Sequence, residues 1–242
     1  MTVVSGLAVA FLALVHIGFP RFDRAAHRHL HLWLPLSAGV AIGYVFLYVM
    51  PELSDFTAEI IETEPHRAEF LQYRLFFVAL LGLMTYLFID RLGSGDDGLS
   101  HQARRIQGIG FCGYNILLGY LLTALPRPGP VPVLFGVITL GFHFLGIDHQ
   151  IRHTHRELFD RQLRWMLAAS IGIGWAIGMA TNLPHVYFAT ATAFIAGSII
   201  VNVMVEELPD RRRSSLLFFV VGVSIFVAIS LTVRTLLPRL DH

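Results

Sequence analysis

The sequence places a small number of ionisable side chains inside long apolar runs. His16 and His143 lie within two such runs, and Glu206 and Glu207 lie near the end of another. An ionisable group is costly in lipid, so it normally faces the interior of a helix bundle and marks a candidate binding site or pathway. His143 stands beside glycines that let another backbone approach closely. His16 lies near the end of its run, where we expect it to bond a backbone carbonyl.

The densest group of potential ligands follows His143 in the same run. Asp148 and His149 come first, and His153 lies four residues after His149, on the same face of a helix. Two imidazoles at this spacing can hold one metal ion. Arg152 lies among these residues and would repel a cation, so a solvated helix end is the alternative interpretation.

The composition predicts a membrane protein. Of the 242 residues, 55% are hydrophobic and 14% are charged, which is more apolar than a soluble surface of this size tolerates. All 18 basic residues are Arg, and 17 acids leave a formal charge of +1, so no broad cationic field exists to bind nucleic acid. The single cysteine, Cys112, cannot form an internal disulfide.

The chain divides into eight apolar runs, each near the length of roughly 20 residues that a bilayer-spanning helix needs. We therefore predict an all-α, polytopic membrane protein that forms a single transmembrane domain over residues 1–242, in contact with the lipid bilayer. The predicted spans are about 3–19, 32–51, 70–90, 106–125, 131–149, 165–182, 184–207 and 215–236.

The arginines predict the orientation, because short cytoplasmic loops carry an excess of basic residues. One side of the bundle collects 13 of the 18 arginines, and the opposite side carries both termini and an acidic loop between the second and third spans. We expect both termini to be extracytoplasmic, in a bacterial inner (plasma) membrane. The 13 residues are Arg21, Arg24, Arg28, Arg91, Arg104, Arg105, Arg152, Arg156, Arg161, Arg164, Arg211, Arg212 and Arg213.

The second and seventh spans share a pattern. Ala38-Gly39 is followed after eleven residues by Pro51-Glu52, and Ala196-Gly197 is followed after eleven residues by Pro209-Asp210. Matching these spans pairs the first three with the last three, and the odd separation makes their orientations opposite. The pattern therefore predicts an inverted repeat, as in many transporters.

These same segments, from Ala38-Gly39-Val40 to Pro51-Glu52 and from Ala196-Gly197 to Glu206-Glu207-Leu208-Pro209, resemble the ZIP family of divalent-metal transporters. The resemblance implies eight helices in a 3+2+3 arrangement: helices 1–3 over about 1–92, central helices 4–5 over about 105–150 and helices 6–8 over about 163–237. It also implies a metal site built from the two central helices, and Glu206 matches an acid that the family uses along its conduit.

The fourth span keeps only part of the family's His-Asn-x-x-acid-Gly motif. Asn115 and Gly119 fit, whereas the family's His falls on Tyr114 and its carboxylate on Leu118. The family's His in the second span falls on Tyr48.

The fifth span departs further from the family's His-Glu-x-Pro-His motif. His143 fits, but Phe144, Gly146 and Ile147 replace the Glu, the Pro and the second His. A zinc ion needs about four N, O or S donors, so the full site cannot form. We expect Asn115 and His143 to face each other, with Leu118, Phe144 and Ile147 filling the space around them.

The leading interpretation is a ZIP-like transporter of a divalent metal cation (zinc, iron or manganese) or another small solute through a degenerate central site, and the sequence is compatible with a homodimer. Two alternatives stay open: a non-transporting ZIP-like sensor or scaffold, and a heme- or metal-binding oxidoreductase subunit, suggested by twelve histidines. No phosphate loop or hydrolase triad is visible, so we do not expect an enzyme.

The expected pathway residues are Tyr48, Tyr114, Asn115, His143 and Glu206. The candidate metal ligands are Asn115, His143, Asp148, His149 and His153.

Overall fold

The computed structural model describes residues 2–26, 29–63, 68–93, 101–123, 130–181, 185–204 and 213–240. Within these ranges the chain is helical almost throughout and contains no β-strand, in agreement with the predicted all-α class. The described elements are α1 (Thr2–Ala26), α2 (Leu30–Tyr44), η2 (Val45–Val49), α3 (Met50–Thr63), α4 (Ala68–Gly93), α5 (His101–Leu121), α6 (Pro130–Thr154), α7 (Arg156–Leu158), η4 (Phe159–Leu163), α8 (Arg164–Ala180), α9 (His185–Asn202) and α10 (Arg213–Leu240).

Two pairs of α-helices are joined end to end by π-helical segments, η2 between α2 and α3 and η4 between α7 and α8. When each joined set is taken as one helix, the described part of the chain forms eight helices, and each predicted apolar run falls in a different one. The helices extend beyond several of the predicted limits. The first predicted span was 3–19, for example, whereas α1 continues to Ala26.

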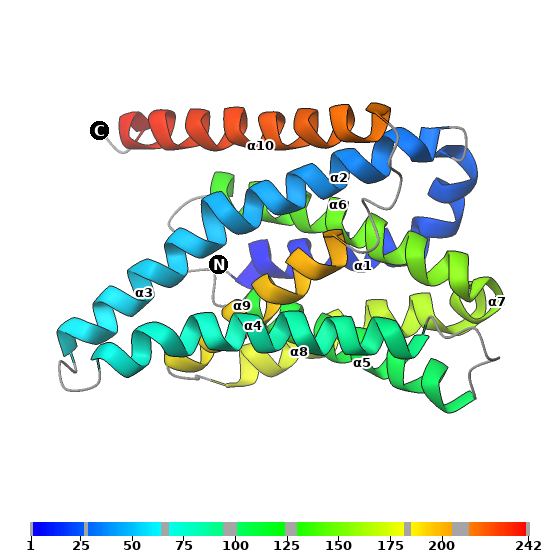
Figure 1. The fold of residues 1–242 in the computed structure, drawn as a ribbon, viewed down its shortest axis with the longest axis horizontal. Helices are drawn as coiled ribbons and strands as arrows, with labels where there is room; N and C mark the ends of the chain where they lie inside the picture. The colour runs from blue at the N-terminus through cyan, green and yellow to red at the C-terminus, as the bar shows by residue number, and fades with distance from the viewer. Residues whose placement is uncertain are drawn as a thin grey trace.

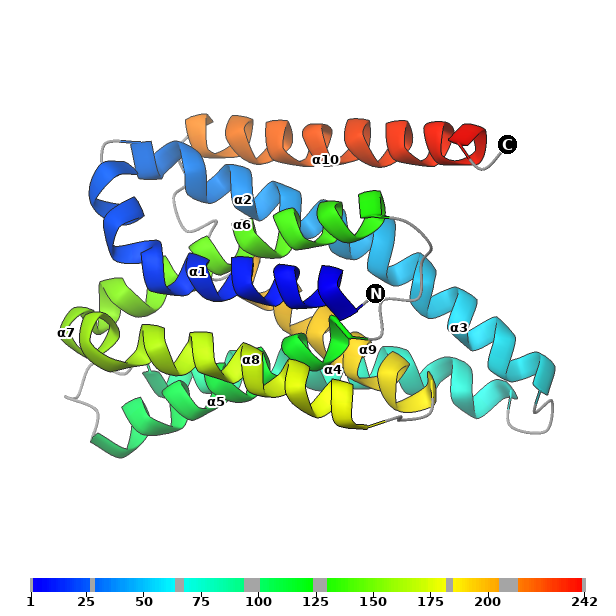
Figure 2. The ribbon, with the colours of Figure 1, turned by 180° about the vertical axis from the view of Figure 1, so that it is seen from behind.

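Successive helices run back and forth along the bundle (Figure 1). The colour ramp shows α2 running in one direction and α9 in the opposite one, and the reverse view in Figure 2 agrees. α1 begins and α10 ends toward the same side, opposite the short element α7.

The outside of the bundle is apolar. Three described helices are long and apolar enough to cross a membrane, and other described helices carry shorter apolar stretches. Large apolar side chains such as Leu7, Phe77, Ile109 and Leu216 are exposed, a surface compatible with contact with lipid. The three candidate spans are Val3–Ala26, Leu32–Ala58 and Arg156–Ala180, and the shorter stretches are Tyr73–Ile89, Val186–Asn202 and Leu216–Thr232.

Glycine lets α2 and α10 cross closely. Gly39 on α2 faces the backbone of Phe219, and Gly222 on α10 faces the backbone of Leu36. A Cβ atom at either glycine would overlap the facing carbonyl oxygen, so a side chain there would push the two helices apart.

The crossing of α4 with α9 has the same construction. Gly82 on α4 faces the backbone of Phe194, and Gly197 on α9 faces the backbone of Ala79. Gly39 and Gly197 are the glycines of the two Ala-Gly pairs in the sequence, so the paired motifs occupy the same kind of contact in two separate crossings.

α2 and α9, the helices that carry the two Ala-Gly pairs, both change from α-helical to π-helical hydrogen bonding. The π-helical segment η2 begins at Val45, six residues after Gly39, and Val203, six residues after Gly197, is π-helical too. In the first case Pro51 gives the reason, because its ring would clash with the carbonyl four residues earlier in a regular α-helix. Pro209, the matching proline, lies outside the described residues.

The remaining helices pack around α1. α1 contacts both α6 and α8, and α5 packs along α8. At the latter crossing Gly119 faces the backbone of Ile171, and Gly174 faces the backbone of Ile116. The bundle thus contains one group made of α1, α5, α6 and α8, beside another that holds the α2–α10 and α4–α9 pairs.

We predict that Gly82→Ala destabilises the protein, whereas Gly172→Ala does not. A Cβ atom at Gly82 would overlap the α9 backbone, and overpacking of this kind costs about 1–3 kcal/mol. Gly172 has open space around its Cβ position, so Ala there should be neutral or stabilising because Ala favours helix. Unfolding in detergent micelles measures both changes, and equal stability of the two variants would contradict the close crossing.

Candidate functional site

A fully buried polar cluster joins three helices in the middle of the bundle. The Nδ1 atom of His16 on α1 lies 2.8 and 2.9 Å from the two carboxylate oxygens of Asp148 on α6. Its Nε2 atom lies 3.0 Å from the side-chain oxygen of Asn115 on α5. All three residues have an exposed fraction of 0%, so their polar atoms depend on one another rather than on solvent.

The hydrogen bonds fix where the protons of this cluster lie. The Nδ2 atom of Asn115 donates to the carbonyl of Phe111 at 2.9 Å, which leaves the side-chain oxygen of Asn115 facing His16. Because that oxygen can only accept, Nε2 of His16 must donate. Nδ1 faces carboxylate oxygens, so a second proton must lie between His16 and Asp148. Imidazole and carboxyl groups can each carry that second proton.

Apolar side chains seal the cluster. The ring of Phe144 stacks on His16 with their centroids 4.4 Å apart. Leu118, Phe144 and Ile147 are all buried. The polar atoms therefore sit in a dry environment, where hydrogen bonds are strong and an unpaired polar group is costly.

The expectation that His16 bonds a backbone carbonyl near a helix end was wrong. α1 continues ten residues beyond His16, to Ala26, so its imidazole lies within the helix and opposite α5 and α6. Asn115 and His143 are both buried, as expected, but they have different partners. His143 Nε2 lies 2.9 Å from the hydroxyl of Tyr114, which reaches across from α5, while Asn115 bonds His16.

A second polar cluster lies between α1, α6 and η4, nearer the end of the bundle that holds α7. We call this the arginine-rich end, because Arg152, Arg156, Arg161 and Arg164 lie there. Arg152 donates to the carboxylate of Asp160 at 2.8 and 3.1 Å and also to the carboxylate of Asp23. His149 Nδ1 lies 3.3 Å from Asp23.

The two polar clusters belong to one strip along the α1–α6 contact. Asp148 and Arg152 are four residues apart on α6, and His16 and Asp23 are seven apart on α1, so each pair shares a helix face. The strip therefore continues from the sealed cluster at His16 toward the arginine-rich end of the bundle.

A small cavity of about 50 Å³ lies between α5, α6, α9 and the α2–η2–α3 helix. Tyr48 and Glu52 line it from the α2–α3 helix, Thr192 lines it from α9, and Leu118, one turn beyond Tyr114, lines it from α5. The hydroxyl oxygen of Thr192 is buried without a hydrogen-bond partner. A cavity of this size with polar groups on its wall can hold water.

The structure brings two of the candidate metal ligands, Asn115 and Asp148, together on His16 and gives the others different neighbours. Asn115 and Asp148 bond His16, His143 bonds Tyr114, and His149 bonds Asp23. His153 is exposed, with its ring centroid 6.0 Å from that of His149. Within the described ranges, no group of three or more His, Cys, Asp or Glu side chains is placed to hold a metal ion.

The expected pathway residues divide in a similar way. Tyr48 lines the small cavity, Tyr114 and His143 form a bonded pair, and Asn115 belongs to the sealed cluster. Glu206 lies outside the described residues.

Sequence reasoning missed His16 as the centre of the site. The signal that could have found it is the pair of polar spacings, His16 to Asp23 and Asp148 to Arg152, which place a polar stripe on each of two apolar helices. A buried carboxylate also needs a partner, and few ionisable groups in the apolar runs were available to Asp148.

Comparisons with protein-family models, curated proteins and solved structures found no match to the chain. The resemblance to the ZIP family therefore stays a prediction from the sequence.

We predict strong coupling between His16 and Asp148. Either His16→Leu or Asp148→Leu alone leaves a buried polar or charged partner unpaired, a change that costs about 3–5 kcal/mol. The double variant leaves only the Asn115 oxygen without its donor. It should therefore be less destabilised than the sum of the single variants, by about 0.5–3 kcal/mol. Unfolding of all four proteins in detergent measures this, and strictly additive losses would contradict the bond.

Proposed function

We propose that the chain is an integral membrane transporter of a small cation, and that the His16–Asn115–Asp148 cluster is the central binding site of its transport pathway. The observation that carries this proposal is the complete burial of a histidine and a carboxylate, bonded to each other, in a bundle with an apolar exterior. Such groups are rare in membrane helices because they are costly, and they commonly mark ion pathways or proton relays.

The surroundings of the cluster support a pathway along the bundle. On one side of it stand the Tyr114–His143 pair and the cavity lined by Tyr48 and Glu52. On the other side, the polar strip continues to Arg152, whose charge is offset by the carboxylates of Asp160 and Asp23. Polar groups thus follow one another along α6, where a purely structural helix contact would need none.

The chemistry of the cluster favours a cation as substrate. Nδ1 of His16 and the carboxylate of Asp148 share a proton, and the same two donor groups are ligands for zinc, iron or manganese when that proton leaves. We therefore propose the proton or a divalent metal ion as the transported species.

We further propose eight spans in a ZIP-like 3+2+3 arrangement, with both termini extracytoplasmic. The opposite directions of α2 and α9, the equivalent contacts of Gly39 and Gly197, and the π-helical residues six positions later support an inverted repeat. α1 and α4 end, and α5 begins, toward the end of the bundle that holds α7 (Figure 2), and the last turns of α1 and α4 carry Arg24 and Arg91, which supports the orientation.

Transport by purified protein in sealed vesicles tests the proposal. We predict that full-length protein carries Zn²⁺, Mn²⁺, Fe²⁺ or protons down a gradient, measured with trapped metal-sensitive and pH-sensitive dyes. Asp148→Asn and His16→Gln should reduce the rate to that of protein-free vesicles, because each removes one of the two groups that share the proton.

A buried hydrogen bond elsewhere provides the matched control. Ser198 on α9 donates to the carbonyl of Gly82 on α4, and neither residue bonds a member of the cluster, so Ser198→Ala should keep its transport rate. Failure of the wild-type protein to carry any of the four cations would overturn the proposed function. Unchanged transport by Asp148→Asn would show that the pathway lies elsewhere.

A further inference from the structure

The arginine-rich end of the bundle contains a hollow of about 720 Å³. Pockets that enclose small ligands commonly have volumes of this order, about 300–1,000 Å³. The walls come from α5, the end of α6, the α7–η4 segment and the start of α8. They include Gly108, Ile109, Arg156, Arg161, Leu163 and Met166.

The hollow exists because the chain leaves helical geometry after α6. His155 has φ −138° and ψ 57°, so the following residues turn before α8 begins. Phe159 is fully buried and packs edge-on against Phe19, 5.9 Å between centroids, which anchors the turn. Gly108 on α5 leaves room for Leu163, because a Cβ atom at Gly108 would lie only 3.1 Å from its side chain.

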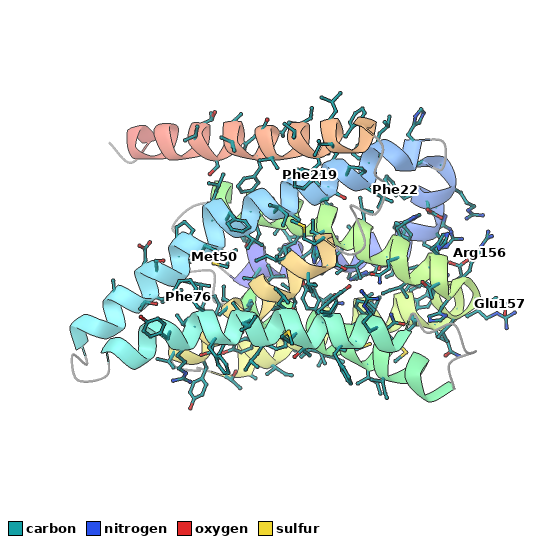
Figure 3. All side chains as sticks on the ribbon, viewed as in Figure 1. Phe22, Met50, Phe76, Arg156, Glu157 and Phe219 are labelled. Atoms are coloured by element: carbon teal, nitrogen blue, oxygen red, sulfur yellow. The ribbon has the colours of Figure 1, made fainter. Side chains whose placement is uncertain are left out.

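The charges around the hollow are unequal. The carboxylate of Asp160 on this turn is bonded to Arg152. Arg156 and Arg161 are both exposed, and neither forms an ion pair among the described residues. Glu157 is the single acid among the described lining residues. Figure 3 shows Arg156 and Glu157 at the outer end of the bundle. The hollow therefore has a net positive rim.

The lining of the hollow also contains exposed apolar side chains. Ile109 and Met166 line the hollow with exposed fractions of 67% and 47%. The hollow also lies at the first residues of the candidate span Arg156–Ala180, the depth at which lipid headgroups meet a spanning helix. A positive rim beside an exposed apolar wall at this depth matches a molecule with an anionic head and an apolar tail.

We propose that this hollow is a binding site for an anionic phospholipid. Arg156 and Arg161 bind the phosphate, and the acyl chains run along Ile109 and Met166. Basic pockets between membrane helices on the cytoplasmic side recognise anionic headgroups in this way. A free phosphate would use the arginines but leave the apolar wall exposed, so the lipid fits more of the lining. The site is independent of the proposed transport pathway.

Native mass spectrometry of the delipidated full-length protein tests the proposal, with phosphatidylglycerol, phosphatidylcholine and glycerol 3-phosphate as probes. We expect phosphatidylglycerol to bind more tightly than phosphatidylcholine. The double variant Arg156→Gln/Arg161→Gln should weaken phosphatidylglycerol binding about tenfold or more, because each basic residue near the surface attracts the anionic lipid. Glu157→Gln should strengthen binding, since it removes the acid that opposes the phosphate.

Arg91 is the matched control. It is exposed in the last turn of α4 but does not line the hollow, so Arg91→Gln should leave phosphatidylglycerol binding unchanged. An equal loss in Arg91→Gln, equal affinity for phosphatidylcholine, or no loss in the double variant would each overturn the site. Glycerol 3-phosphate that binds as tightly as the lipid would overturn the lipid assignment in favour of a free phosphate. Glu157→Gln introduces no new charged group and is expected to increase phosphatidylglycerol binding. It therefore tests the site even if the double variant fails to fold.

Discussion

The hydrogen bond between His16 and Asp148 is the interaction on which the rest of the site depends. Neither group can bond water where it lies, so each requires the other, and Asn115 completes the set from a third helix. This requirement joins α1, α5 and α6 at one point. It also keeps a proton in the middle of an apolar bundle, since the bond to the carboxylate requires one.

The cluster lies within the group made of α1, α5, α6 and α8, beside the group that holds the α2–α10 and α4–α9 pairs. Glycine contacts make the α2–α10, α4–α9 and α5–α8 crossings close. The small cavity lies between the groups, with Tyr48 and Thr192 on one wall and Leu118 and Leu140 on the other. Leu118 and Leu140 lie about one helical turn from Tyr114 and His143, so the proposed function requires the two groups to move apart at this cavity for an ion to reach that pair.

The helices could be predicted from the sequence because their apolar runs are long and separated by polar turns, and each run falls in one helix. The equivalence of Gly39 and Gly197 could also be predicted, because a local spacing of small residues and prolines encodes it. The C-terminal end of α1 could not be predicted, because the first apolar run ends at about residue 19, whereas α1 continues through Pro20 to Ala26.

The site was harder to predict than the helices. His16 lies 132 positions from Asp148 and 99 from Asn115, so no local spacing links them. The ZIP resemblance directed attention to Asn115 and His143 and placed both in the interior. It could not identify their partners, because Tyr114 stands where the family has a ligand and its hydroxyl bonds His143. Partner choice depends on how three helices rotate about their axes, and apolar periodicity does not determine that rotation.

The protonation of His16 is the most direct measurement of the central claim. In ¹⁵N-labelled full-length protein in bilayers, solid-state NMR can assign the His16 ring by comparison with His16→Gln. The structure predicts a proton bonded to Nε2, donated to Asn115, and a second hydrogen-bonded proton between Nδ1 and Asp148. An Nε2 atom without a proton would contradict this arrangement, because it would make His16 an acceptor from Asn115 and leave the cluster with one proton, between Nδ1 and Asp148, instead of two.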